Sequence, residues 1–184
     1  MELSLIYRSK IIVRAYEGWI SLADRVLDIG CGNAVVTEEL RKHFCCNFVG
    51  TDVLSYCQRN IPFKLMGNPD KLPFCDQEFE IAMFNDTLHH CYNVEAILNE
   101  ALRVARKILV FEVEPTLIVK ITDMLANQIH NQKMNKAVNL NTSGYWRAYF
   151  KDLGFDFEFR KVKKPSPFWI PNNFAFKLSK NNIR

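Results

Sequence analysis

Residues 26–34 read Val-Leu-Asp-Ile-Gly-Cys-Gly-Asn-Ala, and this stretch decides how the rest of the chain is expected to fold. The apolar residues at 26, 27 and 29 predict a short strand that is covered on both faces, as in a parallel sheet. Gly30 and Gly32 then allow a turn in which the backbone comes close to a ligand. A helix is predicted directly after the turn, so its unpaired N–H groups point at whatever lies above it.

Acidic residues mark the ends of the first two predicted strands. Asp28 lies near the carboxyl end of the first strand, and the second strand, residues 47–52, ends at Asp52. Open α/β sheets bind ligands at this edge, where a carboxylate can accept both hydroxyls of a ribose. A dinucleotide fingerprint would place a third glycine where Val35 stands, which argues against a nucleotide-linked oxidoreductase.

The segment from Asp28 to Ala34 resembles the first motif of class I S-adenosylmethionine-dependent methyltransferases, Asp/Glu-x-Gly-x-Gly-x-Gly, with Ala34 in place of the third glycine. Three further features follow in the family's order. They are the acidic end of the second strand, Gly-Asn-Pro-Asp-Lys-Leu-Pro-Phe at 67–74, and Leu-His-His at 88–90. The style is closest to type 11-like small-molecule enzymes, including those of quinone biosynthesis, and some transfer-RNA wobble-uridine methyltransferases share it.

The resemblance implies an α/β fold, a three-layer Rossmann-like sheet of about seven mostly parallel strands, with the last strand antiparallel and helices on both faces. We expect a single methyltransferase domain over residues 1–184. Its parts are an N-terminal helix within 1–24, a cofactor-binding half at 25–115, and a substrate-side half at 116–184 with a terminal hairpin.

Hydrophobic periodicity places the other elements. The remaining predicted strands are 63–66, 79–84, 107–113, one that begins at 155, and 173–179. The predicted helices are 3–20, 34–44, 94–105, one that begins near 116, and one that begins near 143 and stops at Gly154. A helix or turn is expected at 54–60. Asn93 and Ser143 have the side chains that cap a helix N-terminus.

The resemblance also implies S-adenosyl-L-methionine as cofactor and assigns its contacts. The Gly turn would lie under the amino-acid portion, Asp52 would hold the ribose, and the carbonyl of Asn85 would lie near the amino group. Asn68 replaces an acid that holds adenine in the family, and Pro69 has no N–H to offer the ring. The predicted cofactor-binding residues are Asp28, Gly30, Cys31, Gly32, Asp52, Val53, Asn68, Pro69 and Asn85.

Residues 85–91 follow the fourth predicted strand and hold the titratable groups nearest the expected methyl group. The predicted catalytic residues are Asp86, His89 and His90. Histidine exchanges a proton near pH 7, whereas in the resembled family paired histidines often support the fold, and both interpretations stay open. Asn-Asp-Thr-Leu at 85–88 departs from the Asn/Asp-Pro-Pro-Tyr/Phe of enzymes that methylate adenine or cytosine amino groups.

Composition adds expectations about metals and compartment. The six cysteines form no Cys-x-x-Cys pair, so we expect no zinc or redox motif and reduced thiols in a cytoplasmic protein. Glu112 and Glu114 share one face of a predicted strand, but no third ligand accompanies them and no metal site is expected. Residues 1–14 lack a signal-peptide layout, and no apolar run is long enough to span a bilayer.

Two groups of side chains have alternative interpretations. Aromatics on the predicted N-terminal helix (Tyr7, Tyr16 and Trp19) are expected to pack, although they could line a substrate pocket. Residues after the strand at 155 (Lys161, Lys163, Lys164, Phe168 and Trp169) are expected to form a solvated hairpin, with contact to nucleic acid as the alternative.

The sequence therefore predicts a methyltransferase that acts on a small molecule. An RNA methyltransferase is the alternative within the enzyme class, and the net charge of +4 permits an anionic partner without requiring one. A methyltransferase-like subunit without activity is the alternative outside it, since Ala34, Asn68 and Pro69 depart from the family pattern. The acceptor atom and the oligomeric state stay open.

Overall fold

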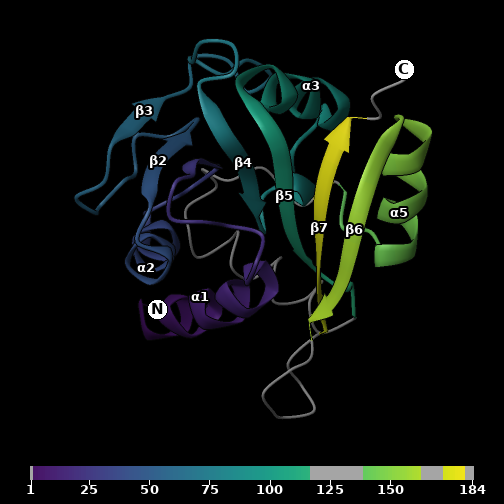
Figure 1. Cartoon of the computed structure of the whole chain (residues 1–184), viewed down its shortest axis with the longest axis horizontal. Helices are drawn as coiled ribbons and strands as arrows, with labels where there is room; N and C mark the ends of the chain where they lie inside the picture. The colour runs from purple at the N-terminus through teal and green to yellow at the C-terminus, as the bar shows by residue number, and fades with distance from the viewer. Residues whose placement is uncertain (1, 117–138, 163–171, 181–184) are drawn as a thin grey trace.

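A computed structural model describes residues 2–116, 139–162 and 172–180. They build a seven-stranded sheet in the order β3-β2-β1-β4-β5-β7-β6 (Figure 1). The strands are β1 (Arg25–Ile29), β2 (Asn47–Asp52), β3 (Phe63–Leu65), β4 (Phe79–Asn85), β5 (Ala105–Val113), β6 (Phe155–Val162) and β7 (Asn173–Lys180). The helices are α1 (Glu2–Tyr16), α2 (Val35–Phe44), the short η1 (Leu88–His90), α3 (Val94–Val104) and α5 (Ser143–Asp152).

The predicted topology is confirmed. Strands β1 to β5 pair in parallel, whereas β7 pairs antiparallel with both β5 and β6. From β1 the chain builds outward through β2 and β3, and then returns to place β4 on the other side of β1. Ligands of open α/β sheets bind at such a reversal, outside the carboxyl ends of the strands. The ends of β1 and β4 are therefore where a site is expected.

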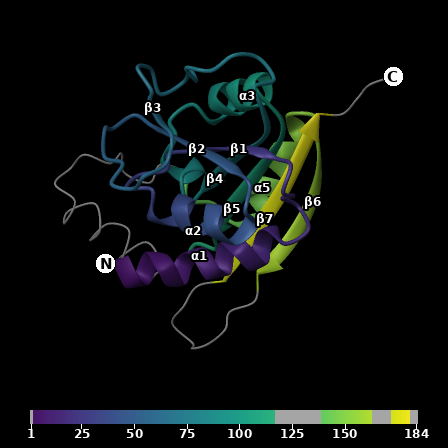
Figure 2. The ribbon, with the colours of Figure 1, turned by 60° about the vertical axis from the view of Figure 1, so that its left-hand side comes forward.

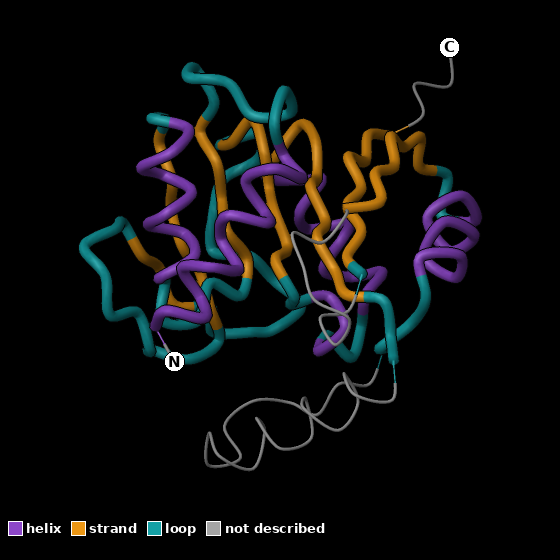
Figure 3. Tube along the Cα trace, turned by 90° about the horizontal axis from the view of Figure 1, so that it is seen from below, coloured by secondary structure: helices purple, strands orange, loops and turns teal. Residues whose placement is uncertain are grey.

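Helices cover both faces of the sheet, which makes three layers (Figures 2 and 3). Apolar residues of α1 and α2 pack on one face, and those of α3 and α5 pack on the other. Strand β4 supplies both cores, because successive side chains point to opposite faces: Ile81 and Met83 contact the first, Ala82 and Phe84 the second. Burial on both faces explains why these strands are apolar throughout.

The alternation of apolar and charged residues in β6 predicts that Arg160 faces away from the phenylalanines of this strand. It does so, and its guanidinium lies against the end of α1. There it donates to the carbonyls of Ala15 (2.9 Å) and Glu17 (2.7 Å) and stacks over Trp19 at 4.0 Å. A cation at the carboxyl end of a helix satisfies unpaired carbonyls and opposes the helix dipole. The outward-facing side of β6 is therefore partly covered by the end of α1.

The aromatics of the N-terminal segment divide as packing predicts. Tyr16 and Trp19 are buried in the core under α1, whereas Tyr7 is 41% exposed. Trp19 also donates from Nε1 to Glu158 at 3.0 Å. Buried Tyr and Trp carry a polar group that needs a partner, and both find one.

Helix boundaries follow the sequence closely. The side chain of Asn93 accepts from the N–H of Ala96, as predicted for a cap. Ser143 does not cap α5; Thr142 does, by accepting from Tyr145 at 3.2 Å. Adjacent hydroxyls could serve equally, and the extended backbone of Thr142 decides between them. Residues 54–60 form turns rather than a helix.

Several predictions lie outside the described residues. They concern most of the helix predicted to begin near 116, and Lys163, Lys164, Phe168 and Trp169 of the predicted hairpin. Over the described ranges, no helix has the length and apolar character needed to cross a bilayer.

Candidate functional site

Two positions of the turn after β1 are occupied by glycine, and the structural reason differs between them. Gly30 (φ 75°) faces the loop after β4, where an added Cβ would lie 2.2 Å from Cγ2 of Thr87. Gly32 (φ 55°) faces open space, since an added Cβ would meet no atom within 4 Å. Close packing thus requires glycine at the first position, while the second leaves bare backbone open to a ligand.

Ala34 occupies the third glycine position of the resembled motif and keeps its backbone conformation. Its φ is 62°, a left-handed angle, and it precedes the first residue of α2. An L-residue with a Cβ pays about 1–2 kcal/mol for this conformation. The substitution therefore leaves the shape of the turn intact but adds local strain.

Asp52 at the end of β2 closes the turn from the other side. Its Oδ2 accepts from the N–H of Gly32 at 2.8 Å, and its Oδ1 accepts from the N–H of Leu54 at 3.0 Å. A carboxylate offers about four lone-pair positions, so two ribose hydroxyls can still be accommodated. Val53 follows with 45% of its surface exposed, an apolar contact beside the carboxylate.

A chain of four side chains runs beneath the turn. Oδ2 of the buried Asp28 accepts from the Thr37 hydroxyl at 2.7 Å, and its Oδ1 accepts from Nδ2 of Asn85 at 3.2 Å. Oδ1 of Asn85 in turn accepts from the hydroxyl of Tyr16 at 2.9 Å. We call Tyr16, Asn85, Asp28 and Thr37 the buried chain. Burial raises the pKa of Asp28 to about 7, although both hydrogen bonds lower it.

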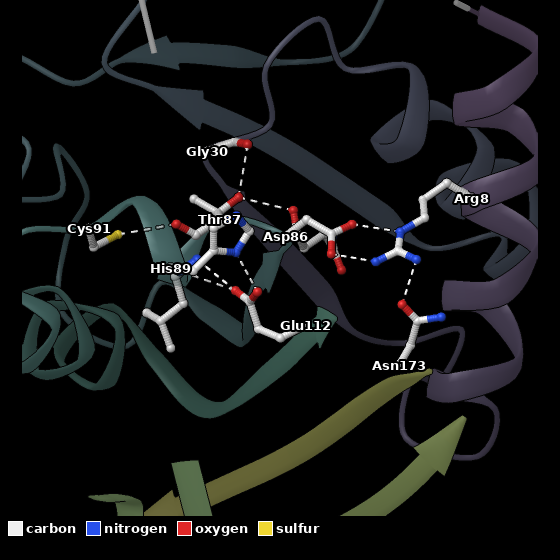
Figure 4. A network of polar contacts seen from close by, with 10 residues as sticks. Arg8, Gly30, Asp86, Thr87, His89, Cys91, Glu112 and Asn173 are labelled. Carbon is white, nitrogen blue, oxygen red and sulfur yellow. Dashed lines mark hydrogen bonds and ion pairs between the residues drawn. The ribbon is translucent and has the colours of Figure 1, made fainter. Parts of the chain in front are cut away.

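Asp86 anchors the N-terminal helix. Its backbone is left-handed (φ 52°), and its carboxylate is held by Arg8 of α1 at 2.7 Å (Nε–Oδ2) and 2.5 Å (Nη2–Oδ1). Arg8 also donates to Oδ1 of Asn173 on β7 at 2.6 Å (Figure 4). Its guanidinium lies 4.6 Å from the centre of the Phe111 ring. The predicted catalytic carboxylate is therefore committed to a two-point ion pair.

The imidazole of His89 contacts the carboxylate of Glu112 on β5, a pairing that the sequence does not predict. Oε2 of Glu112 is 2.5 Å from Nδ1 of His89, and Oε1 accepts from the N–H groups of Leu88 (2.9 Å) and His89 (3.3 Å) (Figure 4). The carboxylate thus orients the imidazole and holds the start of η1. The sequence does indicate that Glu112 has a partner, because an acid within the apolar run of β5 is buried and a buried charge needs one. The ring of His90 lies 4.1 Å from that of His89.

The remaining predicted contacts divide between the turn and the surface. The Sγ of Cys31 points toward β2, where an added Cβ on Gly50 would lie 2.8 Å away, and burial raises the pKa of this thiol. Asn68 and Pro69 are exposed, and the side chain of Asn68 accepts from the N–H of Asp70 at 2.8 Å. The thiol of Cys31 is thus packed against β2, and the 67–70 turn is built around Asn68 itself.

Two other features bear on where the site lies. Surface hollows of about 630 and 530 Å³ are lined by residues around α3, and none of the predicted site residues contributes to them. The polar groups described above gather instead at the carboxyl ends of β1, β2 and β4. Among the described residues, no group of three or more His, Cys, Asp or Glu side chains is arranged to hold a metal ion.

Comparisons with known proteins agree with this geometry. Residues 27–110, from β1 into β5, match the family model of a methyltransferase domain. A SAM-dependent methyltransferase of Thermotoga maritima is 16% identical, with a TM-score of 0.68 over 96% of this chain and 92% of that one. One of Archaeoglobus fulgidus is 18% identical, with a TM-score of 0.61 over 93% and 92%. No curated protein matches the sequence.

The sheet order and the matched domain define a Rossmann-like methyltransferase fold. The resemblance to class I S-adenosylmethionine-dependent methyltransferases is confirmed. The [4+2]-cyclase SpnF, 11% identical, has the same fold with a TM-score of 0.67 over 95% of this chain and 81% of its own. A shared fold therefore does not decide the reaction, which has to be argued from the site.

Proposed function

We propose that this protein is an S-adenosylmethionine-dependent methyltransferase that acts on a small-molecule acceptor. The observation that carries the proposal is the open turn at Gly32, which is tied to Asp52 by a 2.8 Å hydrogen bond and lies within the matched domain. The cofactor, when bound, supplies a methyl group already activated on a sulfonium. The chain has to bind it, orient the acceptor and manage protons.

The residues present fit this cofactor. The bare backbone of Gly32 suits its amino-acid portion, since nothing of the protein lies within 4 Å of a Cβ built there. Asp52 has lone pairs left for ribose hydroxyls, and the exposed Val53 offers an apolar contact to a base. The carbonyl of Asn85 would face the amino group, and Asn68 would approach adenine from its exposed turn.

Acceptor chemistry needs alignment first and a base second. Methyl transfer is in line, so positioning of the nucleophile accounts for much of the rate. A base matters where the acceptor must lose a proton early. His89 is the stronger candidate, because the Glu112 carboxylate keeps a proton on Nδ1 and any proton accepted goes to Nε2. Asp86, by contrast, is held by Arg8.

Titration calorimetry with S-adenosylmethionine and S-adenosylhomocysteine tests the cofactor assignment. We expect micromolar binding of both, and a loss of at least tenfold in affinity for Asp52→Ala, which removes a charged acceptor. Asp152→Ala, at the exposed end of α5, is the matched control and should bind as the wild type does. No binding by a folded wild-type protein would favour a subunit without activity.

A screen of acceptors then separates the substrate classes. Small phenols, enols and amines are tested before RNA, with transfer of labelled methyl as the readout. Transfer to RNA together with affinity that falls steeply with salt would replace the small-molecule proposal by the RNA alternative.

A further inference from the structure

The buried chain joins four different elements of the fold. Tyr16 lies at the end of α1, Asn85 at the end of β4, Asp28 on β1 and Thr37 on α2. Its three hydrogen bonds measure 2.9, 3.2 and 2.7 Å. The N-terminal helix is thereby connected, through side chains alone, to the strand and helix that flank the Gly turn.

All three hydrogen bonds point toward one carboxylate. Thr37 and Asn85 donate to Asp28, so the amide oxygen of Asn85 is turned toward α1 and accepts from Tyr16. Burial raises the pKa of Tyr16 well above its ordinary value, so its hydroxyl remains a donor. Protonated Asp28 would itself be a donor, and satisfying it at Asn85 would require the amide to turn and release Tyr16.

The same helix holds the next residue as well. Arg8 pairs with Asp86 at 2.5 and 2.7 Å. Side chains of α1 therefore bind two consecutive residues at the end of β4, Asn85 and Asp86. Thr87 follows and contacts Gly30, since its hydroxyl lies 3.3 Å from the Gly30 carbonyl and 3.0 Å from that of Asn85, either of which can accept its one hydrogen. A shift of α1 would therefore be transmitted to the Gly turn by two routes. One runs from Arg8 through Asp86 and Thr87, and the other is the buried chain that starts at Tyr16.

We propose that the buried chain couples the docking of α1 to binding at the Gly turn, with Tyr16 as a positioning residue that is effective only while Asp28 is ionised. The inference rests on the proposed function, because the ligand at the turn is taken to be the cofactor. Tyr16 touches no ligand in this proposal. It holds Asn85, and Asn85 holds the carboxylate under the turn.

The surroundings of Asp28 make its charge adjustable. Its pKa is about 7, because burial and, to a smaller extent, the charge of Asp52 raise it more than the Thr37 and Asn85 hydrogen bonds lower it. Cys31 lies within electrostatic range, as do Arg8, Asp86 and Glu112 around Tyr16. Affinity for a ligand at the Gly turn should therefore be full above about pH 7 and fall as the pH drops through that value.

Tyr16→Phe removes the hydroxyl and keeps the ring. We expect affinity for S-adenosylhomocysteine at pH 8, measured by calorimetry, to fall about three- to tenfold, the usual effect of one hydrogen bond. Tyr145→Phe, on the partly exposed face of α5, is the matched control and should not change it. Lowering the pH to 6 should weaken the wild type but leave Tyr16→Phe less affected, since its α1 is already uncoupled.

Hydrogen exchange tests the coupling by a readout other than affinity. Adding S-adenosylhomocysteine should slow amide exchange in α1, and Tyr16→Phe should lose most of this protection. Thr37→Val, at the other end of the buried chain, provides a second variant if Tyr16→Phe does not fold.

The outcomes separate the two proposals. Wild-type binding with unchanged affinity in Tyr16→Phe, or with α1 exchange unaffected by ligand, would overturn this inference and leave the cofactor assignment intact. Absence of binding by the folded wild type would overturn both.

Discussion

Oε2 of Glu112 lies 2.5 Å from Nδ1 of His89, and both side chains are almost fully buried. The same carboxylate accepts the N–H groups of Leu88 and His89. One acid on β5 therefore shapes the loop that follows β4 and sets the orientation of its first histidine. Glu112 is a positioning residue here, whatever proton chemistry His89 performs.

Glu112→Gln should lower the free energy of unfolding by about 1–3 kcal/mol, because buried N–H groups lose a charged acceptor. Urea denaturation measures this, and methyl transfer should fall with little change in cofactor affinity. Glu114→Gln, one residue past the end of β5, is the control and should cost under about 1 kcal/mol, since Glu114 is less buried. Equal stability of Glu112→Gln and the wild type would contradict the assigned role.

Ala34→Gly should stabilise the protein by about 0.5–1 kcal/mol, because it relieves a left-handed backbone at φ 62°. Thermal unfolding with and without S-adenosylhomocysteine measures stability and binding together. Ala148→Gly, on the exposed face of α5, is a control of opposite sign and should cost about 1 kcal/mol. A destabilised Ala34→Gly would mean that the Cβ contributes more through packing than it costs in strain.

Arg8→Ala should destabilise the fold by about 1–3 kcal/mol, since it leaves Asp86 and Asn173 without their shared donor. The loss should shrink at high salt, which screens the ion pair. Chemical denaturation at two salt concentrations checks both points. Lys10→Ala, exposed on the same helix, should have little effect; a similar loss there would show that the ion pair of Arg8 is not responsible.

Asp28→Asn should remove a dependence of stability on pH. The pKa of Asp28 is about 7 in the folded protein against an ordinary 3.8, so the folded state keeps a proton that the unfolded chain loses. The stability from this group is therefore full below about pH 4 and is lost as the pH rises to about 7, on the order of 2–4 kcal/mol.

Unfolding free energies at pH 5 and pH 7.5 test this sign. The difference between Asp28→Asn and the wild type should move in favour of the variant as the pH rises, even if the substitution has a constant cost. Asp152→Asn, on the surface, should show no such trend. A difference that is the same at both pH values would refute the shifted titration.

Local patterns predicted most of the fold because their causes are local. The strand before Gly30, the cap at Asn93 and the turn geometry depend on neighbours in sequence, and each is found where it was expected. The register of β4 against β5 sets Asn85 beside Phe111, and this pairing brings Glu112 to His89. No local pattern carries that information.

The same reasoning explains what was missed at the candidate site. The sequence places Asp28 and Asn85 at one edge of the sheet, but their hydrogen bond and the contact from Tyr16 depend on how α1 docks. Strand alternation places Arg160 on the outward face of β6, but it does not reveal that the end of α1 lies there. Roles of the predicted cofactor and catalytic residues stay predictions until binding and transfer are measured.

The position of β7 has a consequence for synthesis. It lies between β5 and β6 although it follows both in the chain, and its first residue, Asn173, holds Arg8 of the first helix. During synthesis, β6 is made before β7, so it has no neighbouring strand to pair with and β5 keeps an unpaired edge until β7 has emerged from the ribosome. Because such long-range pairing is slow, the nascent chain would remain without a closed sheet or a docked α1, and hence without a complete site, until the last strand is free to insert.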